Sequence, residues 1–281
     1  MNITASLCGG MAIIIHSNMS TESITLPPLP ILTRAFRSFD KRIGESTLTE
    51  GMRDLLDKTA GLENISIKGL EGETRRILEE EGVLLVCNHP HDAESIILLG
   101  TMPPRDDVSI IAAHNQMRLG RNMAAHILPV YPYRQEQTTS NLKLSVRLAK
   151  KFTSPPYPQE EMDRRNHATI SLAAAKTSEG ELVALFPEGV SGKSGKWRKG
   201  IGHLVSQIEP SKPVYFAMAH VKGTSDWDSL RVIPGLRNIM RKGSISFARP
   251  ELFSSFNLPQ NPNDITEYLQ GTYSKWVNTL A

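Results

Sequence analysis

One histidine, His89, stands two residues after the apolar run Val83 to Cys87 and shortly before two acids, Asp92 and Glu94. An imidazole is well suited to take a proton from a hydroxyl near neutral pH, and a carboxylate can hold its other ring nitrogen as a donor. Both acids are candidates for that partner. A purely structural histidine is the alternative, but two acids within five positions favour a general base at His89.

A second polar segment, Phe186-Pro187-Glu188-Gly189, follows another apolar run. It combines a carboxylate with a glycine-rich stretch, whose backbone amides can approach an anion closely. The cations behind it could hold a phosphate group, although solvated surface charges are the alternative explanation. These cations are Lys193, Lys196, Arg198 and Lys199.

Spacing argues against several other kinds of site. A nucleotide-binding P-loop needs a glycine where this chain has Pro187, and the glycines that follow do not have the spacing of a dinucleotide fingerprint. The histidines and acids around His89 are too crowded for a helical metal motif. We therefore expect no metal.

The order of these motifs resembles the glycerol-3-phosphate and lysophospholipid acyltransferase superfamily, to which 1-acylglycerol-3-phosphate acyltransferases belong. Asn88-His89 is followed five residues later by Glu94, and Phe186 to Gly189 comes about a hundred residues further on. In that family a histidine and an aspartate remove the proton of the acceptor hydroxyl. The resemblance implies this role for His89 and Glu94, with Asp92 as the alternative partner because Glu94 replaces the usual aspartate.

The resemblance, which extends from Ile65 to the C-terminus, also implies acceptor-binding residues. The third family motif falls on Glu188 and Gly189, and the second places a phosphate-binding arginine at Arg134, with Arg164 or Arg165 as alternatives. Lys193 is a further phosphate-binding candidate. The fourth motif matches Pro213 to Ala217 without its second proline, since Phe216 stands there.

The family implies transfer of an acyl group from acyl-CoA or acyl-carrier protein to a hydroxyl of a glycerol phosphate or lysophospholipid. The thioester is a co-substrate, and no cofactor is expected. A covalent acyl-enzyme is disfavoured, because Cys8 and Cys87 have no evident triad and Ser95 lacks a nucleophile-elbow pattern. The alternatives are a non-glycerol lipid or sugar acceptor, or a non-catalytic lipid or acyl-carrier binding protein of the same fold.

Short apolar runs separated by helical stretches would position these residues. Apolar residues at consecutive positions are typical of strands covered on both faces, so we predict an α/β fold with a mixed, largely parallel sheet covered by helices on both faces. A helix should begin at Pro90, and another should span 265–280. The expected strands are Val83–Cys87, Val108–Ala112, Ile127–Tyr131, Leu182–Phe186, Val214–Ala219 and Ser244–Ala248.

Four segments divide the chain by pattern. We expect a disordered tail at 1–28, an N-terminal helical hairpin at 29–62, and an acyltransferase α/β domain at 63–281 with a loop or lid insertion at 135–163. Thr47 and Glu50 have the spacing of a capping box. The basic, amphipathic hairpin should pack on the body of the protein, with peripheral membrane contact as the alternative.

Charge and composition set the remaining limits. The 281 residues carry a formal net charge of only +3, which does not indicate nucleic-acid binding. The two cysteines do not form a close pair, and no apolar run approaches the roughly 20 residues that cross a bilayer. We expect a cytoplasmic protein, with peripheral binding to the cytoplasmic face of a membrane as the alternative.

Overall fold

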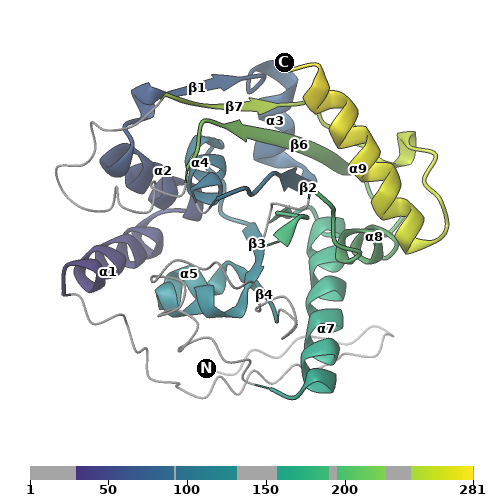
Figure 1. The fold of residues 1–281 in the computed structure, drawn as a ribbon, viewed down its shortest axis with the longest axis horizontal. Coiled ribbons are helices and arrows are strands. Elements are labelled where there is room, and N and C mark those ends of the chain that lie inside the picture. The colour runs from purple at the N-terminus through teal and green to yellow at the C-terminus, as the bar shows by residue number, and fades with distance from the viewer. Residues whose placement is uncertain (1–29, 92, 132–156, 190–194, 226–241, 281) are drawn as a thin grey trace, which may run out of the picture.

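The protein is built around one sheet of eight strands, drawn in Figure 1. The structure is a computed structural model that describes residues 30–91, 93–131, 157–189, 195–225 and 242–280. Neighbouring strands follow the order β1-β7-β6-β2-β5-β3-β4, and β8 pairs with β6. The strands are β1 (Ile65–Lys68), β2 (Gly82–Cys87), β3 (Val108–Ala113), β4 (Ile127–Val130), β5 (Leu182–Leu185), β6 (Val214–Lys222), β7 (Gly243–Phe247) and β8 (Glu251–Leu252).

Strand direction confirms the predicted fold class. The pairs β1–β7, β2–β5, β2–β6, β3–β4 and β3–β5 are parallel, whereas β6 runs antiparallel to β7 and β8. Every residue of β2 and β5 is buried, as expected for central strands with helices on both faces. The sheet is therefore mixed and largely parallel.

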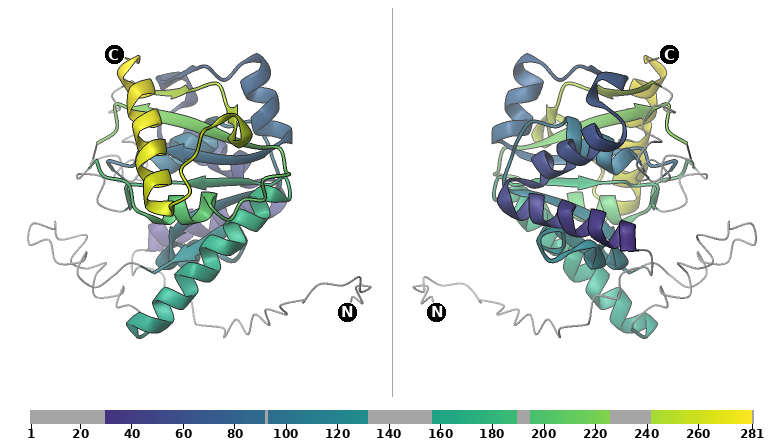
Figure 2. Two further views of the ribbon diagram at one scale, coloured as in Figure 1. Left: turned by 90° about the vertical axis from the view of Figure 1, so that its right-hand side faces the viewer. Right: turned by 90° about the vertical axis from the view of Figure 1, so that its left-hand side faces the viewer.

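Helices cover both faces of the sheet (Figure 2). Side chains from α1 to α4 share one hydrophobic core with Val83, Leu85 and Cys87, while α7, α8 and α9 share the other with Leu84 and Val86. This alternation follows from the two-residue period of a strand. The helices are α1 (Pro30–Glu45), α2 (Leu48–Thr59), α3 (Gly72–Glu80), α4 (Glu94–Thr101), α5 (Arg121–Ala125), α7 (Gln159–Ser178), α8 (Gly200–Val205) and α9 (Pro262–Asn278), with short 3-10 helices at Leu62–Asn64, His114–Leu119 and Phe253–Ser255.

The predicted helical hairpin consists of α1 and α2. Thr47 Oγ1 accepts a hydrogen bond from the backbone N of Glu50, and the Glu50 carboxylate accepts one from the backbone N of Thr47, both at 3.1 Å, which confirms the capping box. Phe39 and Ile43 of α1 and Met52 of α2 are buried in the first core. The apolar face of the hairpin therefore packs against the body of the protein.

Two predicted boundaries are wrong. The helix expected from Pro90 begins only at Glu94, because Pro90 and His91 are not helical and the Glu94 carboxylate accepts a hydrogen bond from the backbone N of His91. The loop expected at 135–163 is helical from Gln159, where α7 begins directly after Pro158. The tail at 1–28 and residues 135–156 of that loop lie outside the described residues.

Candidate active site

The ends of two neighbouring strands bring the first and third sequence motifs together. β2 ends at Cys87, just before His89, and its parallel neighbour β5 ends at Leu185, just before Phe186. Parallel neighbours end at the same edge of a sheet, and this edge is where open α/β sheets form sites. The rings of His89 and Phe186 accordingly lie 4.8 Å apart between centroids, at an interplanar angle of 36°.

His89 contacts the carboxylate of Glu94. Its Nδ1 lies 3.2 Å from Glu94 Oε2, where the Glu94 side chain is fully buried and that of His89 is 18% exposed. An ionised carboxylate only accepts hydrogen bonds, so Nδ1 carries the proton in the neutral ring and Nε2 keeps a lone pair. This arrangement gives His89 the tautomer that a general base needs.

Glu94 is held in its ionised form by its neighbours. Burial raises the pKa of this carboxyl, but hydrogen bonds from His89 and Thr224 outweigh burial, and the pKa lies below its usual value. Oε2 accepts from the backbone N of His91 at 3.2 Å as well as contacting His89. A carboxylate with a lowered pKa stabilises the fold above its unfolded pKa, and this contribution is lost as the pH falls through the folded pKa.

Glu188 and Gly189 lie beside this pair. Burial raises the pKa of Glu188; the charge of His89 opposes that shift and the charge of Glu94 adds to it. Gly189 has a φ of +69°, and a Cβ there would lie 2.3 Å from Nε of Arg198. The backbone N of Arg198 also donates to Pro187 O at 2.8 Å. The missing side chain of Gly189 therefore lets a guanidinium approach the end of β5.

Several predicted residues cannot be placed or lie elsewhere. Asp92, Arg134 and Lys193 fall outside the described residues. Arg164 and Arg165, the alternative phosphate ligands, both form ion pairs with Glu161 on α7 at 2.7 Å.

Cys87 and Phe216 lie in the core rather than at the site. Burial and the charge of Glu94 raise the pKa of the Cys87 thiol well above its usual value, which opposes a nucleophilic thiolate. Phe216 is 1% exposed and packs against Phe253 and Phe256. The residue at the position of the missing family proline therefore fills core volume.

Two further residues of the site were missed from the sequence. Asn88 bonds to β6 through its side chain, and Thr224 lies just beyond β6 and acts on Glu94. Asn88 is adjacent to His89, but nothing local indicates what its amide contacts. Thr224 stands 130 residues from Glu94 in the chain and has no sequence signal that links the two.

Both motifs of the site lie within one family domain. A model of the Acyltransferase family matches residues 64–219, which contain β2, His89, Glu94 and Phe186 to Gly189. The chain belongs to the Acyltransferase family. The match covers more than half of the sequence and confirms the resemblance drawn from the two motifs.

Comparison with a solved structure and with curated proteins adds nothing to the family assignment. A solved structure of the 1-acyl-sn-glycerophosphate (LPA) acyltransferase PlsC from Thermotoga maritima is similar to this acyltransferase with a TM-score of 0.45 and 13% sequence identity, over 89% of this chain and 95% of that one. A search of curated proteins finds no match.

In the ranges that the structure describes, no three His, Cys, Asp or Glu side chains gather into a group that could hold a metal ion. Among the helices in the same ranges, none is both long and apolar enough to cross a membrane.

Replacing Glu94 by glutamine is expected to lower kcat/KM by roughly 100-fold, because an amide of the same size no longer fixes the tautomer of His89. Initial rates over a range of substrate concentrations measure the loss. Glu181→Gln, which changes a carboxylate just before β5 that pairs with Lys176, serves as the control and should retain the wild-type kcat/KM.

Proposed function

We propose that this acyltransferase moves an acyl group from an acyl thioester to a hydroxyl of a glycerol phosphate or lysophospholipid, with His89 as the general base. The observation that carries the proposal is the 3.2 Å contact between His89 Nδ1 and the buried Glu94 carboxylate. This contact leaves Nε2 of the partly exposed His89 ring as the proton acceptor. Glu188 lies at the same edge of the sheet.

The mechanism needs one base and no covalent intermediate on the protein. His89 Nε2 takes the proton of the acceptor hydroxyl as its oxygen attacks the thioester carbonyl. The tetrahedral intermediate then collapses, the carbon–sulfur bond breaks, and the thiolate takes up the proton held by His89. The products are an ester and a free thiol, and the Glu94 carboxylate stabilises the imidazolium formed between the two steps.

Glu188, Gly189 and a cation near them are proposed to bind the acceptor. Family resemblance assigns acceptor binding to Glu188 and Gly189, and phosphate binding to Arg134; Lys193 remains a proposed phosphate ligand. Among the described cations, Arg198 is the one whose guanidinium lies against Gly189. A planar guanidinium can bind a phosphate with two parallel hydrogen bonds, which an ammonium cannot do.

Replacing Arg198 by alanine is accordingly expected to raise KM for a phosphorylated acceptor about 10- to 100-fold with a smaller change in kcat, because a charge-assisted hydrogen bond contributes about 1.5–3 kcal/mol. Initial rates over a range of acceptor concentrations separate the two constants. Lys212→Ala is the control, since Lys212 is exposed before the first residue of β6, at the opposite edge of the sheet. An equal rise in KM for both variants would mean that Arg198 acts only through net charge.

The decisive experiment is mass spectrometry of the products from a panel of acyl thioesters and acceptors. We expect an ester of a glycerol phosphate or lysophospholipid with stoichiometric thiol release. Transfer only to acceptors without phosphate would replace the glycerol phosphate with another lipid or a sugar. Thioester binding without thiol release would instead identify a non-catalytic carrier-binding protein.

We propose that peripheral membrane contact depends on the basic side chains of α1 rather than on its apolar ones. Phe39 and Ile43 of α1 are buried, whereas Arg37, Lys41 and Arg42 are exposed. Basic side chains attract anionic headgroups, and this attraction weakens with salt. Sedimentation with anionic vesicles at low and high salt tests the contact, and equal binding to neutral vesicles would contradict it.

A further inference from the structure

The side chain of Asn88 bonds to both backbone groups of one residue on β6. Its Nδ2 donates to Val221 O at 2.9 Å, and its Oδ1 accepts from Val221 N at 2.8 Å. Both distances are those of ordinary hydrogen bonds. Because one partner is a carbonyl and the other an N–H, only one orientation of the amide satisfies both. The Asn88 amide thus pairs with Val221 as a peptide group would.

This pairing continues the sheet one step beyond the end of β2. The backbone register between β2 and β6 runs from Gly82↔Val214 to Cys87↔Ala219, and β2 then stops, while β6 continues to Lys222. Continued in register, His89 would stand opposite Val221. The side chain of Asn88 occupies that place in the ladder instead. The main chain can therefore leave the sheet at His89 while it stays fastened to β6.

The segment just after β6 also acts on Glu94, the proposed partner of His89. Thr224, two residues beyond Lys222, interacts with the buried carboxyl of Glu94, whose Oε2 contacts His89 Nδ1. Asn88 holds the backbone next to His89, and Thr224 acts on Glu94. Asn88 thus fastens the backbone beside His89 to Val221, while Thr224 lowers the pKa of the Glu94 carboxyl.

We propose that Asn88 is a positioning residue, whose amide replaces the next backbone pair of β2 with β6 and thereby holds the His89 ring in contact with Glu94. The proposal rests on His89 being the base. Without the two bonds to Val221, the backbone at His89 can shift relative to α4, which carries Glu94. A displacement of about 1 Å in a catalytic group can lower a rate about 100-fold.

The test compares initial rates of Asn88→Ala and of the wild type over a range of thioester concentrations. We expect kcat to fall about 10- to 100-fold with a smaller change in KM for the thioester. A residue that only stabilises the fold should leave kcat of the folded protein unchanged.

The chain offers a matched control at another strand end. Asn166 makes the same pair of bonds to the backbone of Tyr131 just beyond β4, with Oδ1 accepting from Tyr131 N at 2.7 Å and Nδ2 donating to Tyr131 O at 3.0 Å. Asn166→Ala should lower the melting temperature by a similar amount but leave kcat of the folded protein close to that of the wild type. If Asn88→Ala folds poorly, Asn88→Ser, whose hydroxyl can bond only one Val221 group, gives the same comparison.

Failure of the positioning role can be distinguished from failure of the proposed function. Wild-type kcat in the Asn88 variants, with His89→Ala inactive, would overturn the positioning role alone. Equal losses of kcat in the Asn88 and Asn166 variants would do the same, because the effect would then follow general destabilisation. Normal turnover in His89→Ala would instead overturn the proposed function.

Discussion

Replacing His89 by alanine is expected to lower turnover by a factor of roughly 100 or more, the range that a positioned general base contributes. The imidazole is the one described group at the ends of β2 and β5 that combines a buried carboxylate partner with a partly exposed ring. Alanine cannot accept the hydroxyl proton, and Cys87, which is buried with a raised pKa, is a poor substitute as a nucleophile.

Thiol release from an acyl thioester, followed with a thiol reagent, gives the rate, and mass spectrometry confirms the ester. His203→Ala, which removes an exposed histidine of α8, is the control and should leave the rate unchanged. Both proteins should unfold at temperatures close to that of the wild type. A His89→Ala protein that transfers acyl groups at a near-normal rate would rule out His89 as the base.

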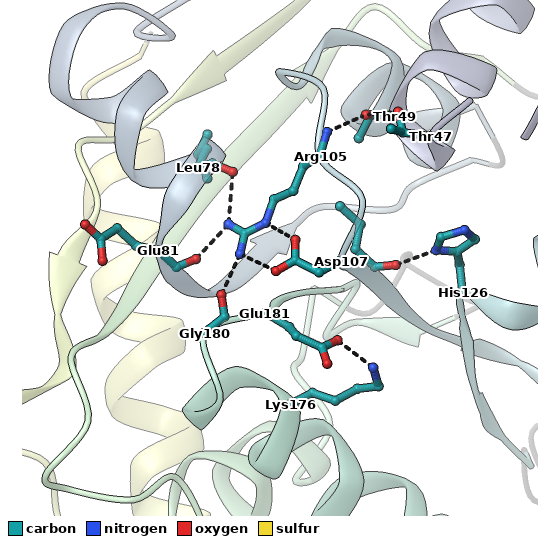
Figure 3. A network of polar contacts seen from close by, with 11 residues as sticks. Thr47, Thr49, Leu78, Glu81, Arg105, Asp107, His126, Lys176, Gly180 and Glu181 are labelled. Atoms are coloured by element: carbon teal, nitrogen blue, oxygen red, sulfur yellow. Dashed lines mark hydrogen bonds and ion pairs between the residues drawn. The ribbon is translucent and has the colours of Figure 1, made fainter. Parts of the chain in front are cut away.

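Replacing Arg105 by methionine is expected to lower the free energy of unfolding by about 3 kcal/mol, since it breaks a buried network of hydrogen bonds. Arg105 is 6% exposed, and its guanidinium donates to Leu78 O at 3.2 Å, Glu81 O at 2.7 Å and Gly180 O at 2.5 Å. It also pairs with Asp107, as Figure 3 shows. One side chain therefore ties α3, β3 and the turn before β5 together.

The backbone of the same residue reaches the helical hairpin, because Arg105 N donates to Thr49 Oγ1 at 3.2 Å. Methionine keeps the length of the side chain but leaves three carbonyls without their donor. Urea unfolding measures the change, and the exposed pair formed by Arg249 and Glu73 supplies the control. Arg249→Ala should change stability by less than about 1 kcal/mol. Equal losses in both variants would show that burial of the Arg105 network adds nothing.

The Arg105 variant also separates stability from catalysis. Arg105 precedes β3, at the amino edge of the sheet, whereas His89 follows β2 at the carboxyl edge. We expect the folded fraction of Arg105→Met to turn over at nearly the wild-type rate. A loss of activity without a loss of stability would contradict this division between the two edges.

Local patterns in the sequence determined most of the strands, the capping box and the choice of His89, Glu94 and Glu188. These features depend on residues within a few positions of one another. A strand needs consecutive apolar residues, a capping box needs Thr47 and Glu50 three apart, and Glu94 stands five residues after His89. The prediction that a helix begins at Pro90 was wrong, although it also rested on a local pattern. The Glu94 side chain accepts a hydrogen bond from the backbone N of His91, and α4 begins only at Glu94.

Only the tertiary structure decided which distant segments meet. The order of β6, β2 and β5 brings Val221 to Asn88 and Phe186 to His89, and the turn at Gly189 brings Arg198 against Gly189. Strand order depends on how all the apolar faces are buried together, and no short stretch of sequence records it. The sequence by itself thus named His89 as a candidate base with Glu94 or Asp92 as its partner, and the packing of the sheet decided which segments hold His89 in contact with Glu94.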